Sequence, residues 1–334
     1  MKVLLTKSFF ISDIDYIRQR IHPEIEIITP ESFTEDAIAE LVYDVNVLFG
    51  GLITEQILQN SFQLRFIQIP WTGIENINFD LIVKYQVTVC NSHSNSKIVA
   101  EHAIALMFDA TKKITYHDRL MRNGNWNRPG INTNSIDPFS GTIIGSKIAI
   151  IGFGAIGRNI YKMLSGFECN FKIFDKYLNS DSITESNITM YLSVDSLYSE
   201  LRDVDYLFLC IPLTTETRGM VNSKLLSSLN ENCIIINTSR GEVINEDDLY
   251  KALIDKKNLF AAIDTWYNYP TKQDTIALPS LNNNFHKLDN IILSPHRAGF
   301  IKDGFPHLDD AIENLNRFYE GKNLINVISP LKQH

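Results

Sequence analysis

Two side chains in the second half of the chain could bind and transform a small carboxylic acid. Arg240 follows the apolar run CIIIN, within the stretch NTSRGEVINEDDL. A guanidinium at the tip of a strand can hold a planar carboxylate through two parallel hydrogen bonds. His296 follows a second apolar run and could supply or remove a proton. Each also has an ordinary structural interpretation, as an arginine paired with an acid and a histidine in a turn.

A glycine-rich turn in the same half of the chain predicts a dinucleotide site. Gly152, Gly154 and Gly157 follow the apolar run IAII and open a predicted helix, and the next predicted strand ends in Asp175. Such glycines let a pyrophosphate approach the helix N-terminus, and the acid binds the ribose hydroxyls. The Asp175 carboxylate would also repel the extra phosphate of NADP. NAD is therefore the expected cofactor, and Lys176 beside it keeps NADP open as the less favoured one.

Two series of short apolar runs must position these side chains. The first series has five (KVLLT, IEIIT, VNVLFG, LRFIQIP and VTVCN), and the second, from Ser146, has six (KIAIIG, FKIFD, YLFLCIP, CIIIN, LFAAID and NIILSP). Nearly continuous apolar runs are typical of parallel strands covered on both faces. Open α/β sheets bind ligands at the carboxyl ends of their strands, so Arg240 and His296 are expected at one edge. With the glycine turn, this pattern indicates a nicotinamide enzyme that reduces 2-oxo acids.

Helical spacing of apolar residues predicts one long helix over 98–114 and a last helix over 308–319, with a loop or connecting arm over 123–138. The last helix cannot form a domain alone, so it is expected to return to the first series. The predicted division is a substrate-binding, flavodoxin-like domain of residues 1–97 and 300–334, and an NAD-binding Rossmann domain of residues 98–299.

Composition limits the partners. The chain has 334 residues, is 44% hydrophobic and carries a net charge of −8, which argues against a nucleic-acid partner. It contains no apolar stretch long enough for a membrane span and no signal-peptide pattern, so a cytoplasmic protein is expected. The four cysteines lack CxxC spacing and fall in or beside apolar runs. Reduced, structural thiols are expected rather than disulfides or metal ligands.

Taken together, the motifs resemble those of the D-isomer-specific 2-hydroxyacid dehydrogenase family, over nearly the whole chain. The matching stretches are WTGIENI from Trp71, VAEHAIAL from Val99, GFGAIG, PLTTETRGMV from Pro212, NTSRGEVINEDDL and SPHRAG from Ser294. The resemblance implies two Rossmann-like domains with parallel sheets flanked by helices, an active site in the cleft between them, and a homodimer formed largely through the cofactor domain.

The resemblance also assigns roles. Arg240 is similar to the family's substrate-binding arginine and His296 to its acid/base. Trp71 belongs to the substrate loop, in which the amides of Thr72, Gly73 and Ile74 hold the carboxylate. Cofactor contacts are implied at Gly152, Gly154, Ala155, Ile156, Gly157, Asp175, Pro212, Thr217, Thr238 and Asp264. No metal is implied.

One position departs from the family pattern. The family has a Glu before the proline of the run DTWYNYP, where it hydrogen-bonds the catalytic histidine, and this chain has Tyr269 there. Asp264 keeps the family's first acid of that run. Arg297, beside His296, is also less usual and is open to two interpretations, a surface cation or a second anion contact.

The expected function is interconversion of a 2-oxo acid and a D-2-hydroxy acid with NAD(H). Two alternatives remain open, an NAD-sensing, corepressor-like scaffold with little or no catalysis, and a dehydrogenase of a small anion such as formate or phosphite. The substrate itself is not specified, although Trp71, Trp126, Trp266, Tyr267 and Tyr269 could narrow its pocket.

Overall fold

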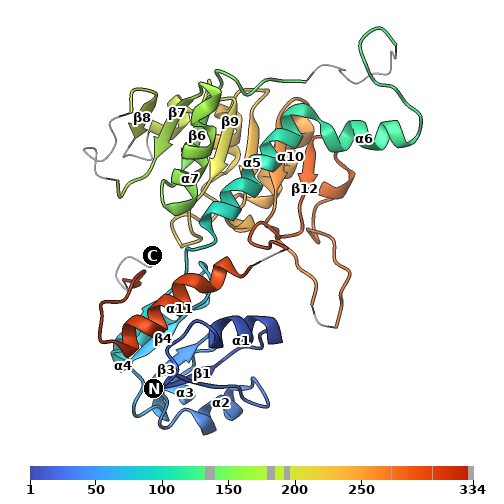
Figure 1. Ribbon diagram of the computed structural model, residues 1–334. Helices are drawn as coiled ribbons and strands as arrows, with labels where there is room; N and C mark the ends of the chain where they lie inside the picture. Colours follow the sequence, from blue (N-terminus) through green and yellow to red (C-terminus); the bar gives the residue numbers. More distant parts are fainter. Residues whose placement is uncertain (132–139, 179–184, 192–195, 272, 303, 330–334) are drawn as a thin grey trace. The chain divides into compact units, whose positions relative to one another are not determined.

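The computed structural model describes residues 1–131, 140–178, 185–191, 196–271, 273–302 and 304–329. It divides into two compact units (Figure 1). Unit 1 comprises Met1–Asn95 with Ile301–His334, and unit 2 comprises Ser96–Phe300. These divisions lie within a few residues of those expected from the sequence. The substrate-binding and cofactor-binding roles of the units remain predictions at this point.

Unit 1 has a five-stranded parallel sheet in the order β2-β1-β3-β4-β5. The strands are β1 (Lys2–Leu5), β2 (Glu26–Ile28), β3 (Val47–Phe49), β4 (Phe66–Gln68) and β5 (Thr88–Cys90). The helices α1 (Ile11–Arg18), α2 (Glu35–Leu41), α3 (Glu55–Gln59) and α4 (Phe79–Tyr85) connect them. Alternate strand residues face two apolar clusters, with Leu4 and Leu48 in one and Val3 and Val47 in the other. Both faces of the sheet are therefore covered.

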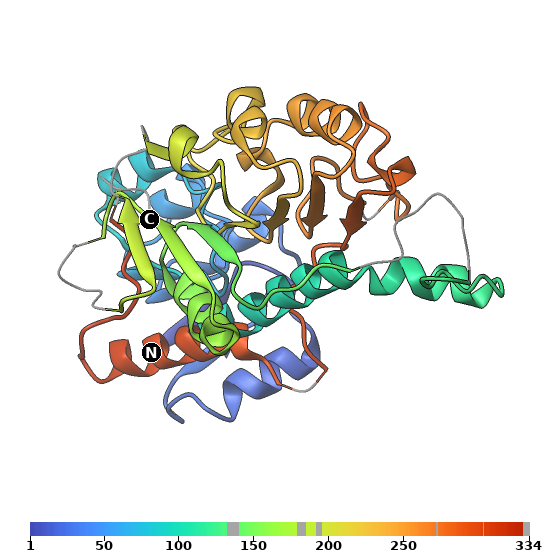
Figure 2. The same cartoon turned by 90° about the horizontal axis from the view of Figure 1, so that it is seen from above.

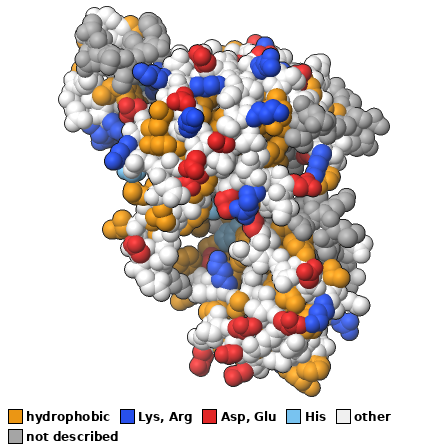
Figure 3. All heavy atoms as spheres, turned by 180° about the vertical axis from the view of Figure 1, so that it is seen from behind, with side chains coloured by type: hydrophobic (Ala, Val, Ile, Leu, Met, Phe, Trp, Pro, Cys, Tyr) orange, Lys and Arg blue, Asp and Glu red, His pale blue; other side chains and the backbone are white. Residues whose placement is uncertain are grey.

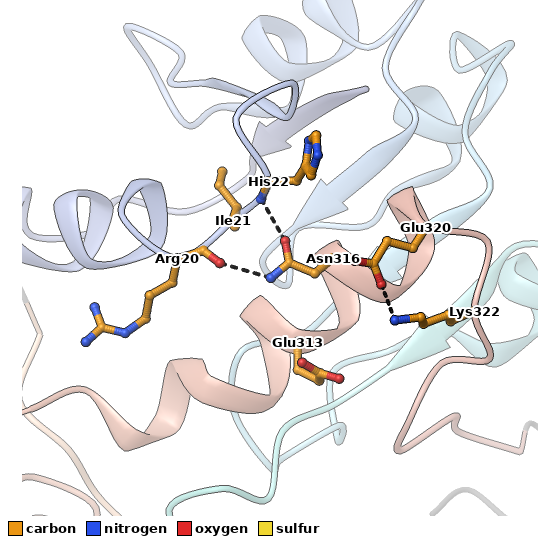
Figure 4. Close-up of a pocket in the computed structure, with 7 residues that line it drawn as sticks. All are labelled: Arg20, Ile21, His22, Glu313, Asn316, Glu320 and Lys322. Atoms are coloured by element: carbon orange, nitrogen blue, oxygen red, sulfur yellow. Dashed lines mark hydrogen bonds and ion pairs between the residues drawn. The ribbon is translucent and has the colours of Figure 1, made fainter.

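The last helix, α11 (Pro306–Tyr319), packs in unit 1. Its residues Leu308, Ala311, Ile312 and Leu315 share an apolar cluster with the first strand. Figure 4 shows a polar contact between this helix and the segment after α1. The Asn316 side chain accepts a hydrogen bond from the His22 amide (2.8 Å) and donates one to the Arg20 carbonyl (2.9 Å). The polar pocket around this contact contains none of the predicted site residues.

Unit 2 has a seven-stranded parallel sheet in the order β12-β11-β10-β9-β6-β7-β8. Its strands are β6 (Lys147–Ile151), β7 (Asn170–Phe174), β8 (Ile188–Tyr191), β9 (Tyr206–Leu209), β10 (Ile234–Asn237), β11 (Phe260–Ile263) and β12 (Ile291–Leu293). Six of these were expected. The seventh, β8, lies at the edge and is only partly buried, so it lacks the continuous apolar run that marks the others.

Helices cover both faces of this sheet, as Figure 2 shows from above. On one face lie α5 (Ser96–Lys112) and α7 (Ala155–Leu164), and on the other α8 (Leu197–Glu200), α9 (Ser223–Ser228) and α10 (Glu246–Asp255). Short 3-10 turns complete the unit at Ser165–Phe167, Gly241–Val243 and Phe285–Lys287. The predicted fold class is confirmed: an α/β fold with two parallel sheets flanked by helices.

The long helix expected over 98–114 is wrong at its end. α5 stops at Lys112, because Lys113 adopts a left-handed backbone (φ 54°), and a second helix, α6, runs over Ile114–Arg122. The Asp109 carboxylate accepts the Thr115 amide (2.7 Å) at the start of that second helix. The first part of the expected loop after it, 123–131, contains neither helix nor strand, and 132–138 lie outside the described residues.

The surface carries charges of both signs on the face drawn in Figure 3, and the cysteines are reduced. On the face drawn in Figure 3, basic and acidic side chains are interspersed. Within the described ranges, no helix combines the length and the apolar character that a membrane span requires. All four cysteines are free thiols, and burial raises the pKa of Cys90 and of Cys210 to about 12. The thiols of Cys90 and Cys210 are therefore protonated at neutral pH and act as apolar packing groups.

Candidate active site

Arg240 is held at the carboxyl end of β10 by the residues around it. The buried Asn237 side chain accepts the Ser239 amide (3.0 Å) and donates to the Arg240 carbonyl (2.8 Å), which closes the turn after the strand. Gly241 is required next, because a Cβ there would come within 2.6 Å of the Trp266 carbonyl oxygen. The guanidinium is half-buried, and its Nη1 donates to the Ser239 carbonyl (2.7 Å).

His296 lies beyond the carboxyl end of β12, two strands away from β10. Its side chain is exposed, and its backbone is left-handed (φ 51°), which is uncommon for a residue with a Cβ. Its amide donates to the Ser294 carbonyl (3.1 Å). A conformation of this kind persists only where surrounding contacts hold it.

Asp264 supplies those contacts from the middle strand. It follows β11 and is fully buried. Its carboxylate accepts the Arg297 and Ala298 amides (both 3.0 Å) and the Ser294 hydroxyl. These donors lie on both sides of His296, so the carboxylate fixes the turn that presents the imidazole. We call residues 294–298 the histidine loop.

The charge state of Asp264 follows from these contacts. Burial alone would raise its pKa, but hydrogen bonds from His102, Ser294 and the two amides of the histidine loop outweigh burial and lower the pKa to about 2. Asp264 is therefore a carboxylate at neutral pH, and its hydrogen bonds are charge-assisted.

Tyr269, at the position of the family's Glu, does lie beside His296. The two ring centroids are 5.4 Å apart and the planes are tilted by 51°. The phenolic oxygen accepts the Trp266 amide (2.9 Å). Burial raises the pKa of Tyr269, against opposing effects of that hydrogen bond and of the Arg240 charge, so the phenol stays neutral at physiological pH. Unit 2 thus brings Arg240, Tyr269 and the histidine loop together, although the contact does not establish a role for Tyr269.

The neighbouring aromatic residues, considered above as pocket-narrowing groups, divide into two kinds. Trp266 is buried and its indole Nε1 donates to the Ser294 carbonyl (2.7 Å), so it holds the histidine loop from beneath. The Tyr267 hydroxyl donates to the Ile244 carbonyl (3.2 Å). Trp126, by contrast, is 55% exposed on the segment after α6.

The glycine turn has the geometry that a pyrophosphate needs. A Cβ at Gly152 (φ 90°) would lie 2.5 Å from the Cys210 carbonyl oxygen, and a Cβ at Gly157 would lie 2.4 Å from the Gly152 carbonyl oxygen. No atom lies within 4 Å of a Cβ placed at Gly154, which is the N-cap residue of α7 and provides no side-chain cap. The helix N-terminus, with Ala155 and Ile156 in its first turn, is therefore open to an anion, and the residues present fit a dinucleotide.

Asp175 stands at the next strand end, where a ribose would follow. One carboxylate oxygen accepts the Phe153 amide of the glycine turn (2.8 Å), and the other accepts the Tyr177 amide (2.9 Å). Lys176 forms an ion pair with Glu216. The Lys176 ammonium, which could have bound the extra phosphate of NADP, is thus already paired with an acid.

The other predicted cofactor residues lie at the carboxyl edge of the same sheet. The Thr217 hydroxyl donates to the Pro212 carbonyl (2.7 Å) and accepts the Thr214 amide (2.8 Å), which shapes the turn after β9. Thr238 is buried directly after β10. Contact of these residues with a cofactor stays a prediction, as does that of Asp264, whose carboxylate already serves the histidine loop.

In unit 1, the Trp71–Ile74 loop follows β4 and is ordered by its own contacts. The Thr72 hydroxyl donates to the Ser92 carbonyl (2.9 Å), and the Thr72 carbonyl accepts the Asn91 side-chain amide (2.8 Å). The Lys7 ammonium lies 4.5 Å from the centroid of the Trp71 ring. The carboxylate-binding role of the amides of Thr72, Gly73 and Ile74 remains a prediction.

Two residues of the site were missed in the sequence. His102, on α5, places its Nε2 3.0 Å from the Ser294 hydroxyl oxygen and 3.5 Å from an Asp264 carboxylate oxygen. His102 and Ser294 both lie inside motifs that carried the resemblance. The available signal was an imidazole next to the apolar positions of α5, since a partly buried polar ring requires a partner.

The Asp264 charge should be visible in the acid stability of unit 2. The pKa of Asp264 in the folded protein lies below the ordinary value of 3.8, so its stabilising effect is complete above pH ~4 and is lost as the pH falls toward 2. A shift of this size corresponds to about 2 kcal/mol. Urea unfolding of wild type and Asp264→Asn at several pH values tests this: the difference in unfolding free energy should shrink below pH ~4, and a constant difference would contradict it.

Comparison with known proteins places the chain in a family. Residues 104–298 match the sequence profile of the D-isomer specific 2-hydroxyacid dehydrogenase, NAD binding domain. The chain belongs to the D-isomer-specific 2-hydroxyacid dehydrogenase family. The matched range contains the glycine turn, Arg240, Tyr269 and His296.

Its relatives span several activities. The chain is 28% identical over 307 residues to a D-3-phosphoglycerate dehydrogenase of Archaeoglobus fulgidus, covering 91% of this chain but only 54% of that protein, so it spans about half the relative's length. It is 26% identical over 300 residues to a glyoxylate reductase of Pyrococcus furiosus, with coverage of 88% and 85%. A solved structure of an NADPH-dependent glyoxylate/hydroxypyruvate reductase from Sinorhizobium meliloti superposes with a TM-score of 0.77 at 18% identity, covering 98% of each chain, and shows the shared fold.

Proposed function

We propose that the protein is an NAD(H)-dependent oxidoreductase that interconverts a 2-oxo acid and a D-2-hydroxy acid. The observation that supports this proposal is that strand ends of the one unit 2 sheet carry a held arginine, an exposed histidine on a fixed loop, and a glycine turn open to a dinucleotide. The bound nicotinamide would supply or accept the hydride.

In this mechanism, Arg240 binds the substrate carboxylate and polarises the carbonyl as negative charge develops on its oxygen. His296 donates a proton to that oxygen during reduction and removes it during oxidation. Proton transfer by a positioned side chain typically contributes about 10²- to 10⁴-fold. Its exposure in unit 2 suits it to contact a substrate, and the buried Asp264 holds it without taking part in the proton transfer.

The decisive experiment follows NADH oxidation with a panel of 2-oxo acids, and NAD reduction with formate and with phosphite. Turnover with at least one 2-oxo acid is expected. Turnover with formate or phosphite alone would replace the proposal by an anion dehydrogenase.

One observation favours a second candidate, a scaffold that binds NADH with little catalysis. The residue beside His296 is a neutral phenol where the family has a carboxylate. Tight NADH binding, measured by fluorescence, without turnover of any 2-oxo acid would support this candidate. The presence of both Arg240 and His296 argues for the enzyme, because a scaffold needs neither.

NAD is proposed as the preferred cofactor, with NADP less favoured, because the Asp175 carboxylate lies next to the glycine turn, where it accepts the Phe153 amide, and Lys176 is paired with Glu216. Asp175→Ala is expected to narrow the preference for NADH over NADPH, since it removes both the ribose hydrogen bonds and the repulsion of a 2′-phosphate. The ratio of the two kcat/KM values measures it, with Asp203→Ala on the surface of the same unit as the control. An unchanged ratio would remove Asp175 from the ribose site.

Tyr269 predicts a distinctive pH profile. The reductive rate requires protonated His296 and therefore falls as the pH rises through the histidine's pKa. A carboxylate beside the ring would raise that pKa because it stabilises the charged imidazolium, and a neutral phenol carries no such charge. Tyr269→Glu is thus expected to move the alkaline limb of kcat/KM upward by about one pH unit or more. The profiles of wild type, Tyr269→Phe and Tyr269→Glu test this, and three superimposable profiles would show that Tyr269 has no influence on His296.

We also propose that two copies of the chain form a homodimer through unit 2. α6 has no buried residue and extends away from the sheet in both views (Figures 1 and 2). Ile114, Met121, Trp126 and Ile131 are exposed on this helix and the segment after it. Exposed apolar side chains along one projecting segment are typical of a contact surface. Light scattering should give the mass of a dimer for wild type, and a monomer at every concentration would contradict the proposal.

A further inference from the structure

His102 reaches the active-site edge of unit 2 from a helix that carries none of the predicted site residues. α5 packs against β10, β11 and β12, the three strands that position Arg240, Asp264 and the histidine loop. The side chain of His102 is 24% exposed, so the ring is largely enclosed at this contact. Its Nε2 faces two groups, the Ser294 hydroxyl oxygen at 3.0 Å and the Asp264 carboxylate at 3.5 Å.

The direction of these hydrogen bonds can be inferred. Asp264 is a carboxylate and can only accept. The Ser294 hydroxyl donates its one proton to that carboxylate, so its oxygen is left to accept. The His102 Nε2 must therefore carry a hydrogen, which it donates mainly to the Ser294 oxygen at 3.0 Å and more weakly to the Asp264 carboxylate at 3.5 Å. The chain of donors runs in one direction, from His102 through Ser294 to Asp264.

We propose that His102 is a positioning residue for the reaction, acting through Ser294 and Asp264 to hold the histidine loop in the conformation that presents His296. This inference rests on the proposed function. His102 itself does not contact the reacting atoms. It keeps the hydroxyl of Ser294 directed at Asp264, and Asp264 in turn holds the Arg297 and Ala298 amides.

The loop needs such support because its central residue is unfavourable on its own. The backbone of His296 is left-handed, a conformation that costs free energy for a residue with a Cβ and persists only where the surrounding structure holds it. Two sets of groups fix the residues around it, the Trp266 indole on the Ser294 carbonyl and the Asp264 carboxylate on the hydroxyl and amides. Removing His102 leaves the Ser294 oxygen without its donor and weakens the second set. The imidazole would then be presented correctly for a smaller fraction of the time.

The test compares His102→Phe, which keeps the ring size without a donor, and His102→Gln, whose amide can reach the same place. His286→Gln, on an exposed turn of the same unit, is the matched control. A small misplacement of a catalytic group can cost up to about 10²-fold. We therefore expect His102→Phe to lower kcat roughly 10- to 100-fold, with KM for the 2-oxo acid and Kd for NADH within about twofold. His102→Gln should regain most of the loss and the control should lose nothing.

A second variant and a second measurement test whether His102 acts through Ser294 and the histidine loop. Ser294→Ala should lower kcat by a similar factor, and the double variant with His102→Phe should lose little more, because both act in one chain. Hydrogen exchange at the Arg297 and Ala298 amides should accelerate in His102→Phe, a readout that does not require turnover.

The outcomes are separable. If wild type reduces no 2-oxo acid, the proposed function fails, and the hydrogen exchange still decides whether His102 supports the loop. If wild type is active and His102→Phe keeps its kcat, or raises only KM, the inference is overturned. Unchanged exchange at both amides also overturns it.

Discussion

Arg240→Lys is expected to lower kcat/KM for 2-oxo acids by roughly 10²- to 10³-fold, the range seen when a donor to a developing negative charge is removed. The substitution keeps the charge but replaces a planar fork by a point ammonium, which cannot form two parallel hydrogen bonds to a carboxylate. The loss should be large here because the backbone of Arg240 is fixed on both sides. Asn237 holds its carbonyl, and Gly241 packs directly on Trp266. A shorter side chain therefore cannot be brought closer by movement of the loop.

Steady-state kinetics with the best 2-oxo acid of the panel measure this effect. The control is Arg202→Lys, an exposed arginine of the same unit. NADH affinity should be unchanged in both variants. Near-wild-type turnover of Arg240→Lys would remove Arg240 from the substrate site.

The sheets could be predicted from the sequence because each strand is a local signal. Runs such as KIAIIG and CIIIN are apolar on both faces, and such runs are typical of a parallel sheet that helices cover on both sides. β8 was not predicted because an edge strand is only partly buried and needs no such run.

The end of α5 was predicted wrongly for another reason. The apolar spacing continues through Ile114, whereas the chain turns at a left-handed Lys113, and nothing in a lysine marks that conformation.

The candidate site divides in the same way. The glycine turn could be predicted because its glycines, strand and acid are close in sequence, and the structure gives Gly152 and Gly157 a steric reason. Contacts between distant elements could not. The His102, Ser294 and Asp264 contacts join a helix and the ends of two strands, and the length of each strand decides which residues meet. Trp266 is an example. The sequence suggested that it could narrow the substrate pocket, whereas in the structure its indole donates a hydrogen bond to the histidine loop.

His296→Asn carries the second large expected effect, a fall in kcat of about 10²- to 10⁴-fold for 2-oxo acids. Asparagine is chosen because it tolerates the left-handed backbone of this position better than most residues, so the histidine loop should keep its hydrogen bonds to Asp264. Its amide can hydrogen-bond a carbonyl oxygen but cannot deliver a proton at neutral pH. The variant therefore removes the proton donor without changing the loop geometry. A substitution with a larger change in shape would alter both at once.

The measurements are kcat for the 2-oxo acid and Kd for NADH, with His286→Asn as the exposed control. We expect NADH binding within about twofold of wild type in both variants, since the glycine turn and Asp175 lie elsewhere along the sheet edge. A kcat within tenfold of wild type would show that another group donates the proton. Tyr269 is the nearest candidate, because its neutral hydroxyl accepts the Trp266 amide and so retains its own proton to donate. In that case His296→Asn combined with Tyr269→Phe should abolish the remaining turnover, and the pH dependence of the single variant should follow a phenol rather than an imidazole.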